Sequence, residues 1–73
     1  MSKSNASGVR AARLMYIRDL LQEEPRTVAE LARLCGVKRR AIYYDLMTLQ
    51  IPPLNVPLQA DSDGRWHIAQ FDE

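Results

Sequence analysis

Gly36 constrains the fold of this chain more than any other position, because it lies between two short segments with helical spacing of apolar residues. Ahead of the first segment, Thr27 and Glu30 form a capping box, in which each side chain accepts a free backbone N–H at the start of a helix. A helix is therefore predicted to begin at about Val28. It should end at Gly36, since glycine tolerates the left-handed conformation that often follows a helix. The residues expected to face inward are Val28, Leu31, Ala32, Leu34 and Cys35.

A second helix is predicted after the glycine, over residues 38 to about 50. Ile42, Leu46 and Leu49 share one side of it at spacings of four and three residues, with Asp45 at the edge of that side. Two short helices joined by a tight glycine turn are typical of a helix-turn-helix, in which the first helix braces the second.

Three successive cations, Lys38, Arg39 and Arg40, occupy the first turn of this second helix. The macrodipole leaves partial positive charge at a helix N-terminus, so each cation there costs a few tenths of a kcal/mol, up to about 1. One interpretation is a solvated charged turn that binds nothing. The other is a site for an anionic partner, because free backbone N–H groups at the same helix end also favour phosphate.

A longer helix is predicted ahead of these two, over residues 9–22. Leu14, Ile17 and Leu21 recur there at helical spacing. Pro25 should end this helix, since proline disfavours helical geometry in the residue before it.

Two short extended segments are predicted within residues 58–69, on either side of the turn sequence DSDG. Gly64 is the expected residue of positive φ in this turn. The apolar residues of the two segments can share one face and close over the helices, as the strands of a β-hairpin. These residues are Leu58, Ala60, Trp66 and Ile68.

The expected fold is therefore one domain, mainly α with a small β-hairpin, over residues 9–70. The polar segment 1–8 is predicted to be a disordered N-terminal tail, and residues 71–73 a C-terminal tail. Composition agrees with a soluble globular protein, since 47% of the 73 residues are apolar and 26% are charged. No apolar run approaches the ~20 residues needed to cross a bilayer, and no signal peptide is evident, so a cytoplasmic location is expected.

Enzymatic chemistry is not expected from this chain. The sequence holds no phosphate loop and no nucleophile motif, and so small a domain encloses little space for a pocket. One cysteine, Cys35, and one histidine, His67, are too few for a disulfide or a structural zinc site. No metal, cofactor or small-molecule substrate is therefore predicted.

The segment TVAELARLCGVKRRAIYYDLMTL carries a family resemblance. It resembles the winged helix-turn-helix domains at the N-termini of DeoR-type, biotin-repressor-type and WYL-type bacterial transcription regulators. Those domains commonly contain T-x-x-E-L-A, a Gly-Val-Ser turn, and then R-R-T-V-Y-R-D-L. The resemblance extends from about residue 13 to residue 69, because NVPLQADSDGRWHI is similar to their wing.

This resemblance implies that the helix over residues 38–50 enters the major groove of double-stranded DNA. Arg39 and Arg40 fall on the paired arginines of the family and Tyr43 on its tyrosine, and the two arginines are expected to contact bases or phosphates. Lys38, Tyr43 and Tyr44 are expected to add contacts to the DNA backbone. Phosphate contacts from the flanks are expected from Arg26 and Arg33.

The chain also departs from the family pattern at several positions. Lys38 replaces a serine or threonine cap, Ala41 a threonine, and Tyr44 an arginine. The turn DSDG is acidic where family wings often carry cations, and Arg65 is the one nearby cation suited to a DNA backbone.

The function expected from these observations is a sequence-specific DNA-binding protein, most simply a transcriptional regulator associated with the nucleoid. Such regulators usually act as dimers, so a homodimer or a partner protein is expected. Met15 and Tyr16 lie off the apolar stripe of the first helix and fit either a scattered surface position or a contact with a second subunit. The alternative function is a winged-helix protein-protein interaction module or accessory subunit, which the net charge of only +1, the acidic turn and Tyr44 favour.

Overall fold

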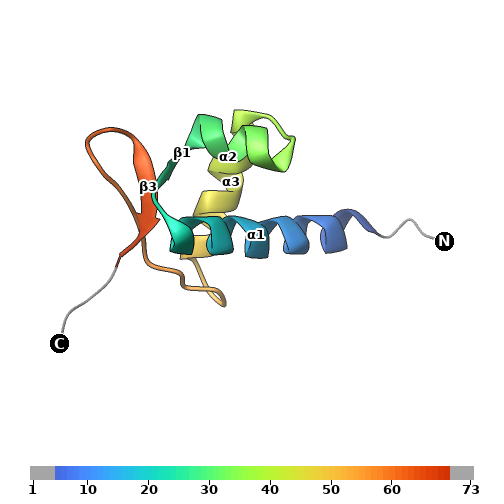
Figure 1. Cartoon of the computed structure of the whole chain (residues 1–73). Coiled ribbons are helices and arrows are strands. Elements are labelled where there is room, and N and C mark those ends of the chain that lie inside the picture. The colour runs from blue at the N-terminus through green and yellow to red at the C-terminus, as the bar shows by residue number, and fades with distance from the viewer. Residues whose placement is uncertain (1–4, 70–73) are drawn as a thin grey trace.

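The computed structural model describes residues 5–69, which form three helices and a small antiparallel sheet (Figure 1). The mainly helical fold with a β-hairpin, predicted from the sequence, is confirmed at this level. The helices are α1 (Asn5–Glu23), α2 (Val28–Cys35) and α3 (Arg39–Gln50), and the strands are β1 (Arg26–Thr27), β2 (Leu58–Ala60) and β3 (Arg65–Ile68).

The first helix is longer than the sequence indicated. α1 begins at Asn5, so residues 5–8, predicted to belong to a disordered tail, are part of the helix. The apolar pattern starts only at Leu14, which made the predicted start too late, and Gly8 weakens a helix by about 1 kcal/mol without ending it. Residues 1–4 and 70–73, which include the predicted C-terminal tail, lie outside the described residues.

The local signals around α2 predicted its two ends correctly. At its start the Thr27 hydroxyl accepts the Glu30 N–H at 3.1 Å, and the Glu30 carboxylate accepts the Thr27 N–H at 2.9 Å. At its end Gly36 adopts the left-handed conformation with φ of 69°, and the Val37 N–H reaches back to the Ala32 carbonyl at 3.0 Å. This tight turn leads directly into α3, which packs against α2.

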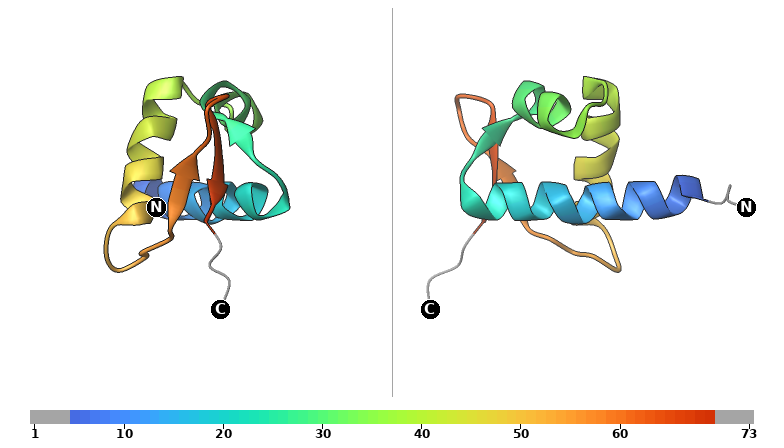
Figure 2. Two further views of the ribbon diagram at one scale, coloured as in Figure 1. Left: turned by 90° about the vertical axis from the view of Figure 1, so that its left-hand side faces the viewer. Right: turned by 45° about the vertical axis from the view of Figure 1, so that its right-hand side comes forward.

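The sheet has one strand more than the predicted hairpin. β2 and β3 pair as expected, with Leu58 opposite Ile68, and Gly64 has φ of 81° in the turn between them. β1 then pairs with the other edge of β3, with Arg26 opposite Trp66, so the strand order is β1-β3-β2. The hairpin is thereby joined to the chain immediately before α2, as the two views of Figure 2 show.

One core combines all three helices and the first strand of the hairpin. The partly buried Trp66 and Ile68 pack against it, as predicted. Leu34 was expected to face inward but is 45% exposed, because it lies about 120° around α2 from the centre of the buried side. The buried apolar residues are Leu14, Ile17, Leu20, Leu21, Val28, Leu31, Ala32, Ile42, Leu46, Leu49 and Leu58.

Candidate nucleic-acid interface

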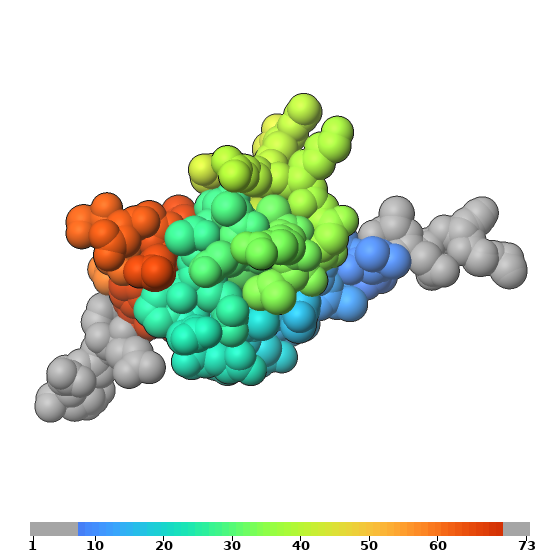
Figure 3. Space-filling view, turned by 45° about the horizontal axis from the view of Figure 1, so that its top comes forward, coloured from blue at the N-terminus to red at the C-terminus, as the bar shows by residue number. Residues whose placement is uncertain are grey.

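The N-terminal end of α3 presents the three cations that the sequence singled out. Lys38 is the N-cap residue of the helix, and Arg39 and Arg40 are its first two residues. All three are exposed. In the space-filling view, side chains from the beginning of α3 project away from the body of the molecule (Figure 3).

These cations have no carboxylate partner in the part of the chain that the structure describes. The ion pairs found within residues 5–69 involve other arginines, and the side-chain hydrogen bonds there do not reach Lys38, Arg39 or Arg40. Lys38 also leaves the helix end uncapped, since its side chain makes no capping hydrogen bond. Positive charge and free backbone donors therefore coincide at one exposed tip.

The two tyrosines that follow this tip are both exposed. Tyr43 is 55% exposed and Tyr44 is 59% exposed, so both side chains are accessible to a partner. Both lie on α3 within two turns of Arg40. The structure thus brings together five of the predicted site residues, four on α3 and Lys38 at its N-cap.

The two remaining predicted contacts lie elsewhere. Arg26 is in β1, where its guanidinium group is 3.2 Å from the Glu23 carboxylate and 3.4 Å from that of Glu24. Its Nε also donates to the Leu20 carbonyl at 3.4 Å, so the end of α1 holds this side chain. Arg33 is exposed on α2. Neither residue belongs to α3, and their contact with DNA stays a prediction.

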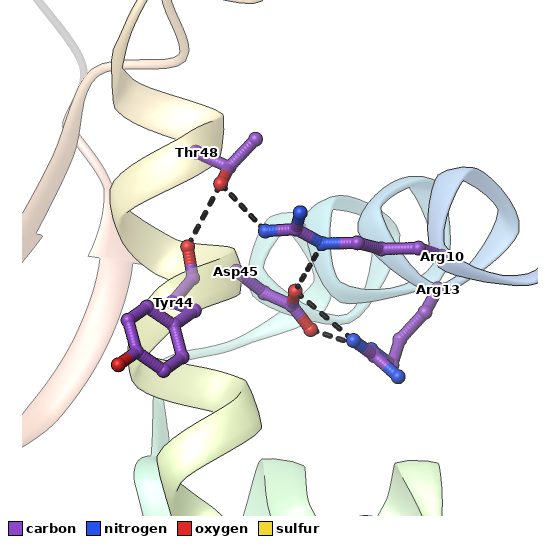
Figure 4. A network of polar contacts seen from close by, with 5 residues as sticks. All are labelled: Arg10, Arg13, Tyr44, Asp45 and Thr48. Atoms are coloured by element: carbon purple, nitrogen blue, oxygen red, sulfur yellow. Dashed lines mark hydrogen bonds and ion pairs between the residues drawn. The ribbon is translucent and has the colours of Figure 1, made fainter. Parts of the chain in front are cut away.

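A buried ion-pair network lies at the middle of α3, and sequence reasoning missed it. Asp45 is fully buried, and two arginines of α1 converge on its carboxylate (Figure 4). Arg13 donates from Nε at 2.5 Å and from Nη2 at 3.2 Å, and Arg10 donates from Nε at 3.2 Å. Arg10 also donates to the Thr48 hydroxyl at 2.8 Å, and that hydroxyl donates to the Tyr44 carbonyl at 2.9 Å.

This network fixes α3 against α1. A buried carboxylate is tolerated only when it is paired and hydrogen-bonded, and here two cations from one helix meet that need. The hydrogen bond to Asp45 raises the pKa of Arg13, against the smaller opposing effect of burial. Arg10 and Arg13 are three residues apart and so share one face of α1. The sequence did contain a signal for this network. Asp45 lies among the apolar positions of one predicted helix, and two arginines lie three residues apart ahead of it, Arg10 and Arg13.

The turn of the hairpin carries negative charge. The Asp61 carboxylate accepts the backbone N–H groups of Arg65 at 3.0 Å and Asp63 at 2.9 Å, and these bonds, chiefly that of Arg65, lower the pKa of Asp61. The Arg65 guanidinium lies 3.8 Å from the Asp63 carboxylate, and this carboxylate offsets part of the positive charge of Arg65. This turn is therefore less suited to phosphate than the tip of α3.

A shallow groove of about 330 Å³ lies between α1 and the end of α2. Its lining is mostly apolar and includes Tyr16, Leu34 and Cys35, and burial raises the pKa of the Cys35 thiol. Residues 5–69 contain no group of three or more side chains suited to holding a metal ion. Within the same range, no helix combines the length and apolar character that crossing a membrane requires.

Comparison with known proteins gives no direct guide to this site. Protein-family models, curated proteins and solved structures were all compared with the chain, and none matches it significantly. The resemblance to winged helix-turn-helix regulators therefore stays a prediction. The function proposed below rests on the chain's own residues and their geometry.

Proposed function

We propose that this chain is a winged helix-turn-helix protein that binds double-stranded DNA sequence-specifically, most simply as a transcriptional regulator. The observation that carries the proposal is the exposed tip of α3, where Lys38, Arg39 and Arg40 have no carboxylate partner among the described residues. Cations are disfavoured at a helix N-terminus in the free protein. A polyanion removes that penalty when it binds.

The side chains at this tip suit both kinds of DNA contact. A guanidinium group donates two parallel hydrogen bonds to O6 and N7 of guanine in the major groove, or to a phosphate. Arg39 and Arg40 take these roles in the proposal. Lys38 contributes a point charge to a phosphate, and the exposed phenols of Tyr43 and Tyr44 can donate to the DNA backbone.

The rest of the domain supports a fixed docking geometry for α3. α2 packs against one side of this helix, and the pairing of Asp45 with Arg10 and Arg13 holds it to α1. A helix that enters a groove must keep its direction, because base contacts depend on the angle at which it docks. The acidic turn near Asp61 is proposed to stay clear of close phosphate contacts.

The expected strength of binding bears on stoichiometry. Four or five neutralised phosphates correspond to a log-log salt slope near −4, since roughly 0.9 counterions are released per contact. So small a footprint suggests weak binding by one copy. We therefore propose that two copies, or this chain with a partner protein, bind half-sites about 34 Å apart. Nucleoid association in the cytoplasm would follow from DNA binding.

One observation favours a second candidate function, a protein-protein interaction module. Apolar side chains are exposed around the groove between α1 and α2, among them Tyr16 and Leu34, and the hairpin turn is acidic. That alternative gives no specific reason for three successive cations at the N-terminal end of a helix. DNA binding explains them, and for this reason it is preferred.

The test is a titration with random-sequence duplex at low and moderate salt. The wild-type chain is compared with R39A/R40A, and the single variant R39A with R18A, a control that removes one cation from a partly buried position of α1. The proposal predicts salt-sensitive binding that is lost in R39A/R40A and largely kept in the control. Absence of binding by the wild-type chain even at low salt would contradict the proposal and favour the protein-interaction module.

A further inference from the structure

Beyond Arg40, the exposed face of α3 changes from charged to apolar. Tyr44 and Met47 follow Arg40 at spacings of four and three residues, so all three share the side opposite the buried Ile42 and Leu46. Met47 is 62% exposed. We call Tyr44 and Met47 the apolar stripe of α3.

The structure leaves the apolar stripe free to contact a partner. The Tyr44 ring points away from Arg10 and Arg13 in Figure 4, and its hydroxyl makes no hydrogen bond within residues 5–69. Thr48, on the same helix, is by contrast occupied, because its hydroxyl accepts from Arg10 and donates to the Tyr44 carbonyl. The stripe therefore offers mainly carbon and sulfur surface, with a single phenol.

The occupant is indicated by what adjoins the stripe. It continues directly from the unpaired cations at the tip, so a ligand that covers both must be anionic at one end and apolar at the other. In the DNA major groove the apolar feature of the base edges is the C5-methyl group of thymine. A rise of 1.5 Å per helical residue puts Tyr44 about 6 Å along the axis from Arg40, or roughly two base-pair steps.

We propose that Tyr44 and Met47 determine sequence specificity by contacting thymine methyl groups in the major groove. These thymines lie within roughly two to three base pairs of the guanine or phosphate held by Arg39 and Arg40. The inference rests on the proposed DNA binding and adds which bases are preferred. This contact would also explain why Tyr44 stands at a position where the family pattern has an arginine.

The experiment removes only the methyl groups. A preferred duplex is first selected from a random library, and its thymines are then replaced by deoxyuridine, which keeps every hydrogen-bonding edge. Each methyl that becomes buried is expected to contribute about a fourfold gain in affinity, the size of one buried CH₂ group. The wild-type chain should bind the deoxyuridine duplex about fourfold more weakly per contacted thymine.

Two variants locate the effect. Y44A/M47A should bind the thymine duplex more weakly and should no longer distinguish thymine from deoxyuridine. Q50A, at an exposed position on the flank of α3, should keep the distinction in full. Melting curves check that both variants fold. Y44F keeps the aromatic ring and removes only the hydroxyl, so it should still distinguish thymine from deoxyuridine. Loss of that distinction in Y44F would contradict a methyl contact by the ring.

The outcomes separate this inference from the proposed function. Equal affinity of the wild-type chain for the two duplexes overturns thymine reading and leaves DNA binding intact. Discrimination that persists in folded Y44A/M47A also overturns it, because another surface would then contact the methyl groups. Failure of the wild-type chain to bind any duplex overturns the proposed function and this inference together.

Discussion

Two pairs of arginines contact or belong to α3, and their surroundings are opposite. Arg10 and Arg13 come from α1 and converge on the buried carboxylate of Asp45. Arg39 and Arg40 begin α3 itself and have no carboxylate partner within the described residues. The difference teaches that charge on this helix serves two purposes, since one pair stabilises the position of the helix and the other is left for a partner.

The two pairs should respond to mutation in opposite ways. Removing one member of a buried ion pair leaves an uncompensated charge in a poorly solvated place, which costs folding free energy. Removing exposed cations from a helix N-terminus relieves a small repulsion and costs binding instead. The variants R10A/R13A and R39A/R40A test the two sides of this contrast directly.

The largest expected effect is on the buried pair. R10A/R13A should lower the free energy of unfolding by about 3–5 kcal/mol, because the fully buried carboxylate of Asp45 would then have no cation partner. Urea unfolding or thermal melting measures the loss. D19A, which removes an exposed acid of α1, is the control and should stay within about 0.5 kcal/mol of wild type. A loss below about 1 kcal/mol in R10A/R13A would show that the network is unimportant for folding.

The next effect concerns the exposed pair. R39A/R40A should lose about 1–3 kcal/mol of DNA-binding free energy for each arginine and reduce the salt slope by as much as about 2. Its free energy of unfolding should stay within about 0.5 kcal/mol of wild type or rise slightly. Parallel binding and melting measurements check both parts. A large loss of stability with unchanged binding would reverse the roles assigned to the two pairs.

A smaller effect is expected at the N-cap of α3. K38S should raise the free energy of unfolding by about 1 kcal/mol, because serine supplies the capping hydrogen bond that the lysine side chain does not make. The same change should reduce the salt slope by about 0.9 if Lys38 contacts a phosphate. K38A is the control, since it removes the charge without adding a cap. Equal stability of K38S and K38A would argue against the capping explanation.

The smallest effect is the pH dependence at the hairpin turn. Hydrogen bonds from Arg65 and Asp63 lower the pKa of Asp61 in the folded chain, so the carboxylate stabilises the fold above its unfolded pKa. That contribution is lost as the pH falls through the lower, folded-state pKa. An NMR titration of the Asp61 carboxyl carbon should show a midpoint below that of an unstructured aspartate. In D61N the stability difference from wild type should be small at neutral pH and vanish in acid.

Local signals in the sequence explain which parts of the fold were predictable. The Thr27–Glu30 capping box and Gly36 act within a few residues, so the bounds of α2 followed directly from the sequence. The two-residue strand β1 has no pattern of its own and exists only because β3 lies beside it. Its absence from the prediction follows from that dependence on a distant segment.

The candidate site also has features that local sequence predicts and features that depend on distant residues. The exposure of Lys38, Arg39 and Arg40 was expected from their place at a helix start, and the structure places them there. The burial of Asp45 depends on two residues more than thirty positions earlier in the chain, and no local pattern indicates that pairing. DNA as the partner stays a prediction, because neither the fold nor the comparisons test it.

The most direct test of the central claim is NMR mapping of the chain with a short duplex at low salt. The account predicts that backbone shifts change most over residues 38–44, that the Nε–H signals of Arg39 and Arg40 shift, and that those of Arg10 and Arg13 stay in place. Changes centred on the hairpin turn or on the groove between α1 and α2, with the tip of α3 unaffected, would contradict it.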